Sequence, residues 1–169
     1  MAATLFPVTV LVDRLVIDSP WATHRWQPAL VLPGAVETPP WTVLAEEADY
    51  TRFYAGTDSL ALYPRETETY KYNIESEKPA VYVILRRTEA EPGVTLLKAT
   101  VCPGEAHALN DSGDDIVEPV PMPPEIFEWV SAYVAENHRE QETFKRKRDR
   151  ADPEALGRRR RAASPDDDD

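Results

Sequence analysis

The sequence predicts an α+β protein: a curved antiparallel sheet or partly closed small barrel of about six or seven strands, with a C-terminal amphipathic helix packed on it. Three observations lead to this prediction. Short runs rich in β-branched residues recur between turn signals, and 16 Pro against six Gly favour short elements joined by stiff connectors. One late segment repeats apolar residues at helical spacing.

The N-terminal part of the chain predicts three strands. Residues 8–17, VTVLVDRLVI, are rich in β-branched residues and favour a strand. Ser19 and Pro20 can cap and open a single helical turn over residues 21–24. Residues 26–32 then alternate as a second strand, and WTVLAEE, residues 41–47, gives a third.

The middle of the chain predicts a hairpin followed by a helix. Residues 56–58, Gly-Thr-Asp, divide the segment into two short strands, residues 52–55 and 59–63. Residues 66–76, ETETYKYNIES, allow a short helix or an extended connector, and the helix is favoured because Thr69, Tyr70, Asn73 and Ile74 can share a face.

The remaining elements complete the sheet and its cover. Residues 80–87 and 95–101 predict a second antiparallel hairpin, and residues 103–109 predict a short helix. The proline-rich residues 116–124 predict an extended, polyproline-like approach. Residues 124–138 predict the amphipathic helix, whose apolar stripe consists of Ile126, Trp129, Val130, Tyr133 and Val134.

Charge divides the chain into a body and a tail. Residues 1–138 carry nine basic and 21 acidic residues, a net charge of −12, whereas residues 139–161 carry ten basic and five acidic residues. We therefore expect one globular domain over residues 1–138 and a mostly disordered tail, basic and then acidic, over residues 139–169. An acidic body repels phosphate backbones, which disfavours a nucleic-acid-binding role.

The cysteine content and the absence of long apolar runs predict a cytoplasmic protein. Cys102 is the single cysteine, so no intramolecular disulfide can form, which fits a reducing compartment. No apolar run approaches the length of a membrane span, and the N-terminal residues do not resemble a signal peptide. We therefore expect no membrane partner.

The first candidate site is the segment PWATHRW. Trp21, His24, Arg25 and Trp26 could form a stacking or cation–π surface for a flat ligand. The alternative is that both indoles pack at the junction of the first two strands while His24 and Arg25 reach water. The framing prolines favour packing, so both tryptophans are predicted to be mostly buried.

Patterns typical of catalysis and metal binding are weak in this sequence. Cys102 and His107 could be a nucleophile and a base, but a lone Cys at a strand end is more typical of a small buried residue. His24, His107 and His138 lack chelating spacing, and no glycine-rich phosphate loop follows a strand. The sequence therefore predicts no catalytic residue and no metal, and leans against an enzyme.

The last candidate site is the basic run FKRKR. It can be a solvated helix end, which is the favoured interpretation, or a docking element for an acidic partner or for nucleic acid, with an aromatic anchor. The residues that would dock are Phe144, Lys145, Arg146, Lys147 and Arg148.

Several segments together resemble a known bacterial family. They are PVTVLVDRLVIDSPWATHRWQPALVLPG, ETETYKYNI with PAVYVILRR, VEPVPMPPEIFEWVSAYVAENH and FKRKR, within residues 6–150. The family consists of uncharacterised proteins encoded beside molybdenum-dependent formate dehydrogenase genes and often labelled molybdopterin-guanine dinucleotide biosynthesis protein A. The glycine-rich loop of guanylyltransferases is absent here, because DRLVIDSPWATHRW follows the first strand.

The resemblance implies association with the maturation or operation of a formate dehydrogenase. The predicted function is therefore a non-catalytic accessory protein, without a cofactor, that binds a formate dehydrogenase subunit or its maturation machinery. The alternative is a molybdopterin-guanine dinucleotide biosynthesis or pterin-nucleotide-binding protein, with Trp21, Arg25 and Trp26 as its stacking face.

Overall fold

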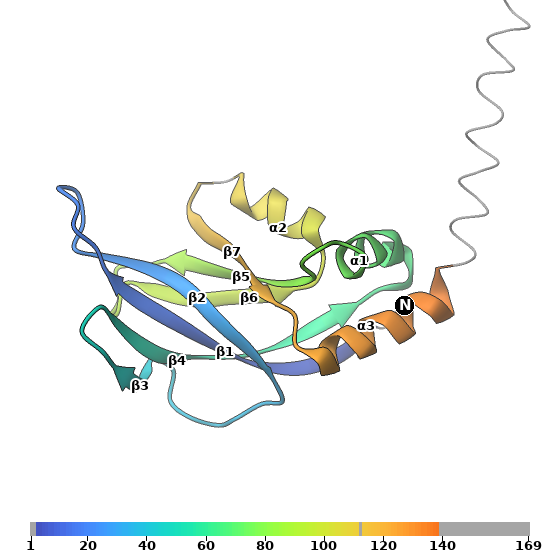
Figure 1. The fold of residues 1–169 in the computed structure, drawn as a ribbon, viewed down its shortest axis with the longest axis horizontal. Helices are drawn as coiled ribbons and strands as arrows, with labels where there is room; N and C mark the ends of the chain where they lie inside the picture. The colour runs from blue at the N-terminus through green and yellow to red at the C-terminus, as the bar shows by residue number, and fades with distance from the viewer. Residues whose placement is uncertain (1–2, 112, 139–169) are drawn as a thin grey trace, which may run out of the picture.

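The computed structural model describes residues 3–111 and 113–138, and these residues form an α+β fold. The predicted class is confirmed, but the single curved sheet or partly closed barrel is wrong. The seven strands of the described residues form two antiparallel sheets, with orders β2-β1-β4-β3 and β6-β5-β7 (Figure 1). The predicted tail, residues 139–169, lies outside the described residues.

The four-stranded sheet is built around β1 (Thr4–Val16). It pairs with β2 (His24–Pro33) on one side and with β4 (Tyr50–Leu62) on the other, and β4 pairs with β3 (Thr42–Glu46). The strands predicted at residues 8–17, 26–32 and 41–47 are thus confirmed, because β-branched side chains suit an extended, half-buried backbone.

The hairpin predicted around residues 56–58 is wrong, since β4 is continuous through this segment. Val10 pairs with Gly56 and Leu11 pairs with Tyr54, so Ala55 is the extra residue of a β-bulge. Gly56 has φ +148°, a backbone conformation that glycine adopts readily. The glycine that resembles a turn signal therefore marks a bulge within one long strand.

The three-stranded sheet contains β5 (Ala80–Arg87), β6 (Val94–Thr100) and β7 (Asp115–Pro121). The hairpin of β5 and β6 is confirmed. The polyproline-like connector predicted for residues 116–124 is wrong, because β7 pairs antiparallel with β5 from Asp115 to Pro121. Since β7 is an edge strand of its sheet, its prolines need not donate to a second neighbouring strand.

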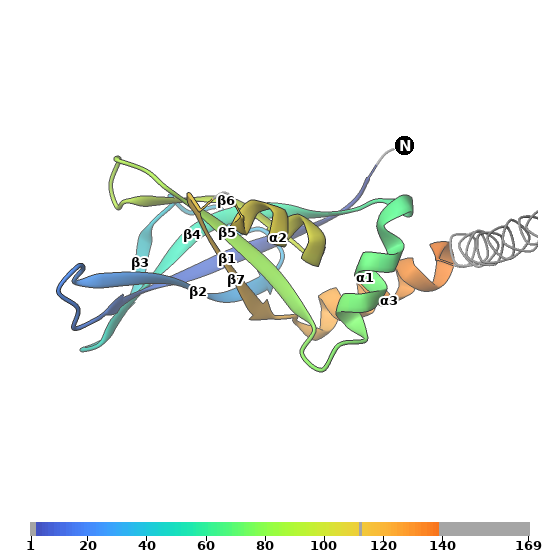
Figure 2. The same cartoon turned by 90° about the horizontal axis from the view of Figure 1, so that it is seen from above.

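Helices gather at one end of the molecule (Figure 2). A 3-10 turn (Pro64–Glu66) leads into α1 (Thr67–Ile74), while α2 (Pro103–Asn110) and α3 (Pro124–Asn137) flank β7. These three helices confirm the predictions. The helical turn predicted for residues 21–24 is wrong: residues 20 and 21 lie in a bend, and His24 begins β2.

The core lies between the two sheets and beneath α3. Alternate residues Val8, Val10 and Val12 of β1 are fully buried and belong to one cluster with the buried residues of β5 and α3. The Phe6 ring lies 5.0 Å from Trp129 of α3, which joins the helix to the four-stranded sheet. Among the described residues no helix is long and apolar enough to span a membrane.

Candidate functional site

The structure separates the two tryptophans of the predicted site. Trp21 lies in the loop between β1 and β2 with 87% of its surface exposed, and its backbone N–H donates to Ser19 Oγ at 3.2 Å. Trp26 lies on β2 and is half-buried. The prediction that both indoles are mostly buried is therefore wrong for Trp21, because it lies beyond the last paired residues of β1 and β2.

Arg25 does not share a surface with Trp26, whereas His24 lies on the same side of β2 as Trp26 and pairs with Val16. Successive strand residues point to opposite faces, so Arg25 and Trp26 lie on different sides of β2. Arg25 Nη2 donates to Gln27 Oε1 at 2.9 Å, and His24 Nδ1 lies 3.0 Å from Thr23 Oγ1. The four predicted residues therefore do not form a shared stacking face.

Trp26 instead belongs to an aromatic cluster assembled from three strands and a loop. Its ring centroid lies 5.5 Å from Trp41 and 5.6 Å from Phe53, and the latter two rings are 5.9 Å apart. The Arg14 guanidinium lies 5.9 Å from the Trp26 ring and 5.3 Å from the Phe53 ring. These distances permit edge-to-face ring packing and cation–π attraction.

Trp41 enters this cluster with an unusual backbone. Its φ of +68° is the left-handed conformation, which is rare for a bulky residue and costs on the order of 1–3 kcal/mol. The Trp41 N–H donates to the Tyr54 carbonyl at 2.6 Å, and the Tyr54 hydroxyl donates to the Val36 carbonyl. Both hydrogen bonds tie the loop between β2 and β3 to β4 and fix the indole.

The cluster is part of a larger apolar face. Val43 pairs with Phe53, and Val16 lies two residues beyond Arg14 on the same side of β1. Val43 is 48% exposed and Val16 is 57% exposed. We call Val16, Trp26, Trp41, Val43 and Phe53, with Arg14 over the rings, the aromatic face.

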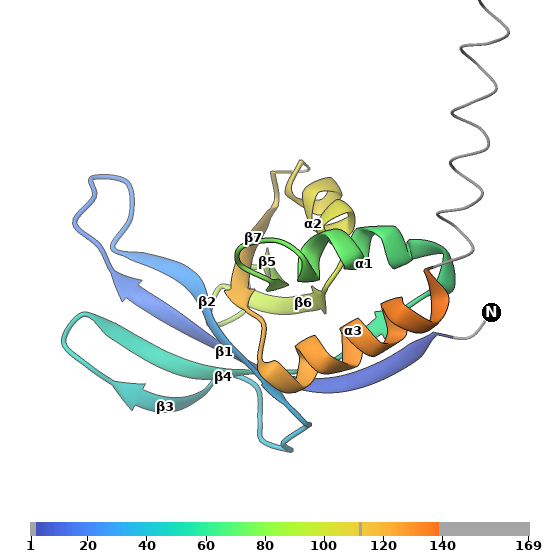
Figure 3. The same cartoon turned by 45° about the vertical axis from the view of Figure 1, so that its right-hand side comes forward.

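The aromatic face lies on the core-facing side of the four-stranded sheet, in the part that extends beyond the three-stranded sheet. Val12 belongs to the core cluster and pairs with Phe53, two residues before Arg14. The ends of the β1–β2 and β3–β4 hairpins project away from the helices (Figure 3). The opposite side of the same strands carries an ion pair, in which Arg52 donates to both Asp13 carboxylate oxygens at 2.8 and 3.0 Å.

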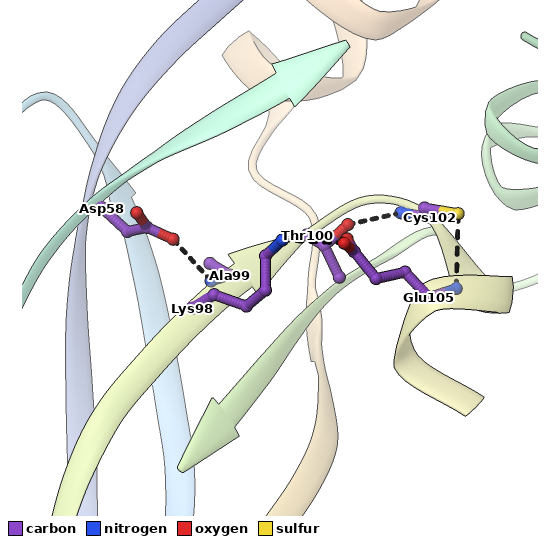
Figure 4. Close-up of polar contacts among 6 residues, drawn as sticks. All are labelled: Asp58, Lys98, Ala99, Thr100, Cys102 and Glu105. Atoms are coloured by element: carbon purple, nitrogen blue, oxygen red, sulfur yellow. Dashed lines mark hydrogen bonds and ion pairs between the residues drawn. The ribbon is translucent and has the colours of Figure 1, made fainter. Parts of the chain in front are cut away.

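A second candidate is a cavity of about 410 Å³ among β4, α1, β6 and the start of α2. Lys98 Nζ donates to Glu105 Oε2 at 2.7 Å at its edge (Figure 4). Burial alone would raise the pKa of Glu105, but hydrogen bonds from Lys98 and Thr100 outweigh it and lower the pKa below its usual range. Glu105 is therefore a paired carboxylate rather than a proton donor.

Cys102 has a structural position beside this cavity. Its Sγ accepts the Glu105 N–H at 3.4 Å as the N-cap of α2, and its own N–H donates to Thr100 Oγ1 at 3.1 Å (Figure 4). Burial raises the pKa of the Cys102 thiol, so the thiolate needed for nucleophilic attack is disfavoured. Its predicted partner His107 is exposed on α2.

A buried tyrosine and a half-buried histidine are the remaining side chains with possible chemistry. The Tyr70 hydroxyl accepts the Tyr63 N–H at 3.0 Å, and burial raises the pKa of Tyr70 above its usual range. His138 Nδ1 lies 3.3 Å from Thr67 Oγ1. Within residues 3–111 and 113–138, no three His, Cys, Asp or Glu side chains are close enough to hold a metal ion.

Reasoning from the sequence missed Arg14, Trp41 and Phe53. The available signal was their position within predicted strands, but pairing them with Trp26 requires the register between strands. The predicted docking residues lie outside the described part of the chain: Phe144, Lys145, Arg146, Lys147 and Arg148.

Comparison with known proteins identifies a family whose function is unknown. No curated protein and no solved structure matches the chain. A family model matches residues 7–148. This range includes all described helices and all described strands, except for the first residues of β1. The chain belongs to this family, which is described as proteins of unknown function, DUF3305.

Proposed function

We propose that this protein is a non-catalytic accessory protein that binds a subunit of a molybdenum-dependent formate dehydrogenase, or its maturation machinery, through the aromatic face. The identity of the partner is suggested by the sequence resemblance described above. The binding role is carried by one observation: an apolar, tryptophan-rich face lies half-exposed on one side of the projecting hairpins.

The composition of this face supports binding to another protein. Residues that dominate protein–protein binding are enriched in Trp, Tyr and Arg and lie at the centre of the contact. The Trp26 ring contacts both Trp41 and Arg14 in the free protein. Because these side chains are already held by their neighbours, they lose little conformational entropy when a partner covers them.

The direct test measures binding of the purified protein to separately purified formate dehydrogenase subunits and maturation proteins by calorimetry. Val43→Glu places a charge within the aromatic face at an exposed position and is expected to weaken binding at least about tenfold, which is ~1.4 kcal/mol. Leu5→Glu is the matched control, because Leu5 is a 60% exposed β1 residue outside that face. Thermal unfolding checks that both variants fold.

The proposal is overturned if neither the subunits nor the purified maturation proteins bind, or if Val43→Glu and Leu5→Glu reduce affinity equally. The pterin-nucleotide alternative has its own readout. Saturable quenching of tryptophan fluorescence by GTP or molybdopterin species, without subunit binding, would replace the accessory role with that alternative.

A further inference from the structure

A second exposed apolar surface lies far along the chain from the aromatic face and shares no residue with it. It is a groove of about 770 Å³ between β5, β7 and the start of α3. Figure 3 shows β7 leading into this helix. Its lining is mostly apolar and comes from Tyr82, Pro119, Pro121, Met122 and Phe127, with Lys78 and Glu128 also present. Phe127 is 36% exposed, so an incoming aromatic ring can reach it.

The helix beside this groove is acidic. The exposed residues Glu125, Glu128 and Glu136 belong to α3, which contains no Lys or Arg. No ion pair within the described part of the chain involves these three carboxylates. The last turn of α3 also lacks a basic residue to balance the negative end of the helix dipole. An occupant of the groove would therefore be favoured by positive charge and by an aromatic or aliphatic anchor.

The chain itself carries such a segment directly after α3. Residues 144–148 read FKRKR, one aromatic residue followed by four cations. Five residues lie between His138 and Phe144, so the two Cα atoms are six steps apart and at most about 20 Å apart when the chain is extended. The helix rise from Phe127 to His138 is about 17 Å, so Phe144 can return to the level of Phe127.

We infer that the segment 144–148 folds back along α3 and docks in this groove of its own chain. Phe144 contacts Phe127 and Tyr82, and the following cations face Glu125 and Glu128. The docked segment is thereby kept from external anionic partners until a competing partner or high salt releases it. The contact depends on partly exposed charges, which salt screens over about 10 Å at 0.1 M. This inference does not rest on the proposed function, because it concerns a different surface and its own occupant.

The test uses the full chain with a nitroxide attached at Thr143→Cys in a Cys102→Ala background. Broadening of NMR signals is measured at Met122, Phe127 and Tyr82. We expect strong broadening at these three residues, and its loss when Phe144→Ala or the pair Glu125→Lys and Glu128→Lys is introduced. Glu47→Lys is the matched control for Glu128→Lys alone, because it makes the same charge change at an exposed residue in the β3–β4 turn.

Charge exchange and mixing make the test specific. Lys145→Glu with Arg146→Glu should abolish broadening, and combining these changes with Glu125→Lys and Glu128→Lys should restore it. Absence of broadening, or equal broadening in the Glu128→Lys and Glu47→Lys proteins, overturns the inference.

Isotope-labelled protein without nitroxide is also mixed with unlabelled nitroxide protein. Broadening found only in that mixture identifies a second copy as the occupant and likewise overturns docking within one chain.

Discussion

Asn73 is expected to be one of the most important side chains for stability. It is 3% exposed on α1, where its Nδ2 donates to the Ala80 carbonyl at 2.8 Å and to the Val101 carbonyl at 2.9 Å. Its Oδ1 accepts the Ala80 N–H at 3.0 Å. One amide thus joins α1 to the start of β5 and to the residue that follows β6.

Asn73→Ala should lower the free energy of unfolding by about 3–5 kcal/mol. Each of the three hydrogen bonds contributes ~0.5–1.5 kcal/mol net, and each buried backbone partner left unsatisfied costs a further ~1–3 kcal/mol unless water reaches it. The removed side chain also leaves a small void between the helix and the sheet. Because the effects overlap, they do not add in full.

Asn73→Asp gives a sharper comparison because it keeps the size and the acceptor oxygen. The carboxylate would face two carbonyl oxygens, so the native state disfavours ionisation and raises the pKa of the new aspartate above its unfolded value. The penalty is therefore absent below the unfolded pKa, grows as pH rises through the folded pKa, and is complete above it. At neutral pH Asn73→Asp should be at least as unstable as Asn73→Ala.

Urea unfolding followed by circular dichroism measures both variants between about pH 4 and pH 8. An unchanged slope against urea would show that the loss belongs to the native state. A cost below about 1 kcal/mol for Asn73→Ala would refute the reasoning, since the buried partners would then not depend on the amide. A pH-independent Asn73→Asp protein would equally refute it.

Three further predictions follow from particular side chains. Two hydrogen bonds from Arg86 lower the pKa of the buried Asp115 carboxyl in the folded protein. The stabilisation from this pair is therefore present above the unfolded pKa and is lost as pH falls through the lower pKa of the folded state. Asp115→Asn should flatten this dependence of the free energy of unfolding on acid pH. Trp26→Ala should cost about 3–5 kcal/mol and Trp21→Ala less than about 0.5 kcal/mol, measured by urea unfolding. Cys102→Ala should cost at most about 1 kcal/mol, the scale of one N-cap bond, and keep full formate dehydrogenase output in complementation.

Each of these predictions has a control variant or an outcome that would contradict it. Asp49→Asn changes an exposed carboxylate and should keep the acid dependence that Asp115→Asn removes. Equal destabilisation by Trp21→Ala and Trp26→Ala would contradict the difference in their burial. Loss of formate dehydrogenase output in a folded Cys102→Ala protein would show that the thiol has a chemical role.

The sequence predicted correctly those helices and strands that are determined by their own residues rather than by a neighbouring strand. The β-branched run of β1 and the apolar stripe of α3 both determine the buried side of an element without knowledge of its neighbours. The buried α1 residues Tyr70 and Asn73 likewise lie on the predicted shared face.

The failures concern elements that depend on a partner strand. Gly56 resembles a turn residue locally, but pairing of β1 on both sides of it keeps β4 extended. Pro119 and Pro121 resemble a polyproline connector until β5 supplies a neighbour for β7. The aromatic face has the same origin, because Arg14 and Trp26 meet only through the register of two strands.

Trp41 helps to decide where the proposed binding role is best tested. Its left-handed backbone costs on the order of 1–3 kcal/mol, and glycine would avoid that cost while keeping the hydrogen bond to Tyr54. The contacts of the indole must therefore stabilise the folded protein by an amount that offsets this backbone cost. Two ring contacts at about 0.5–1.5 kcal/mol each offset most of the strain in the free protein, so a partner is not needed to explain Trp41. Val16 and Val43 make no such ring contacts and remain about half-exposed beside it. Substitution of these valines, rather than of the tryptophans, separates binding to a partner from stability of the fold.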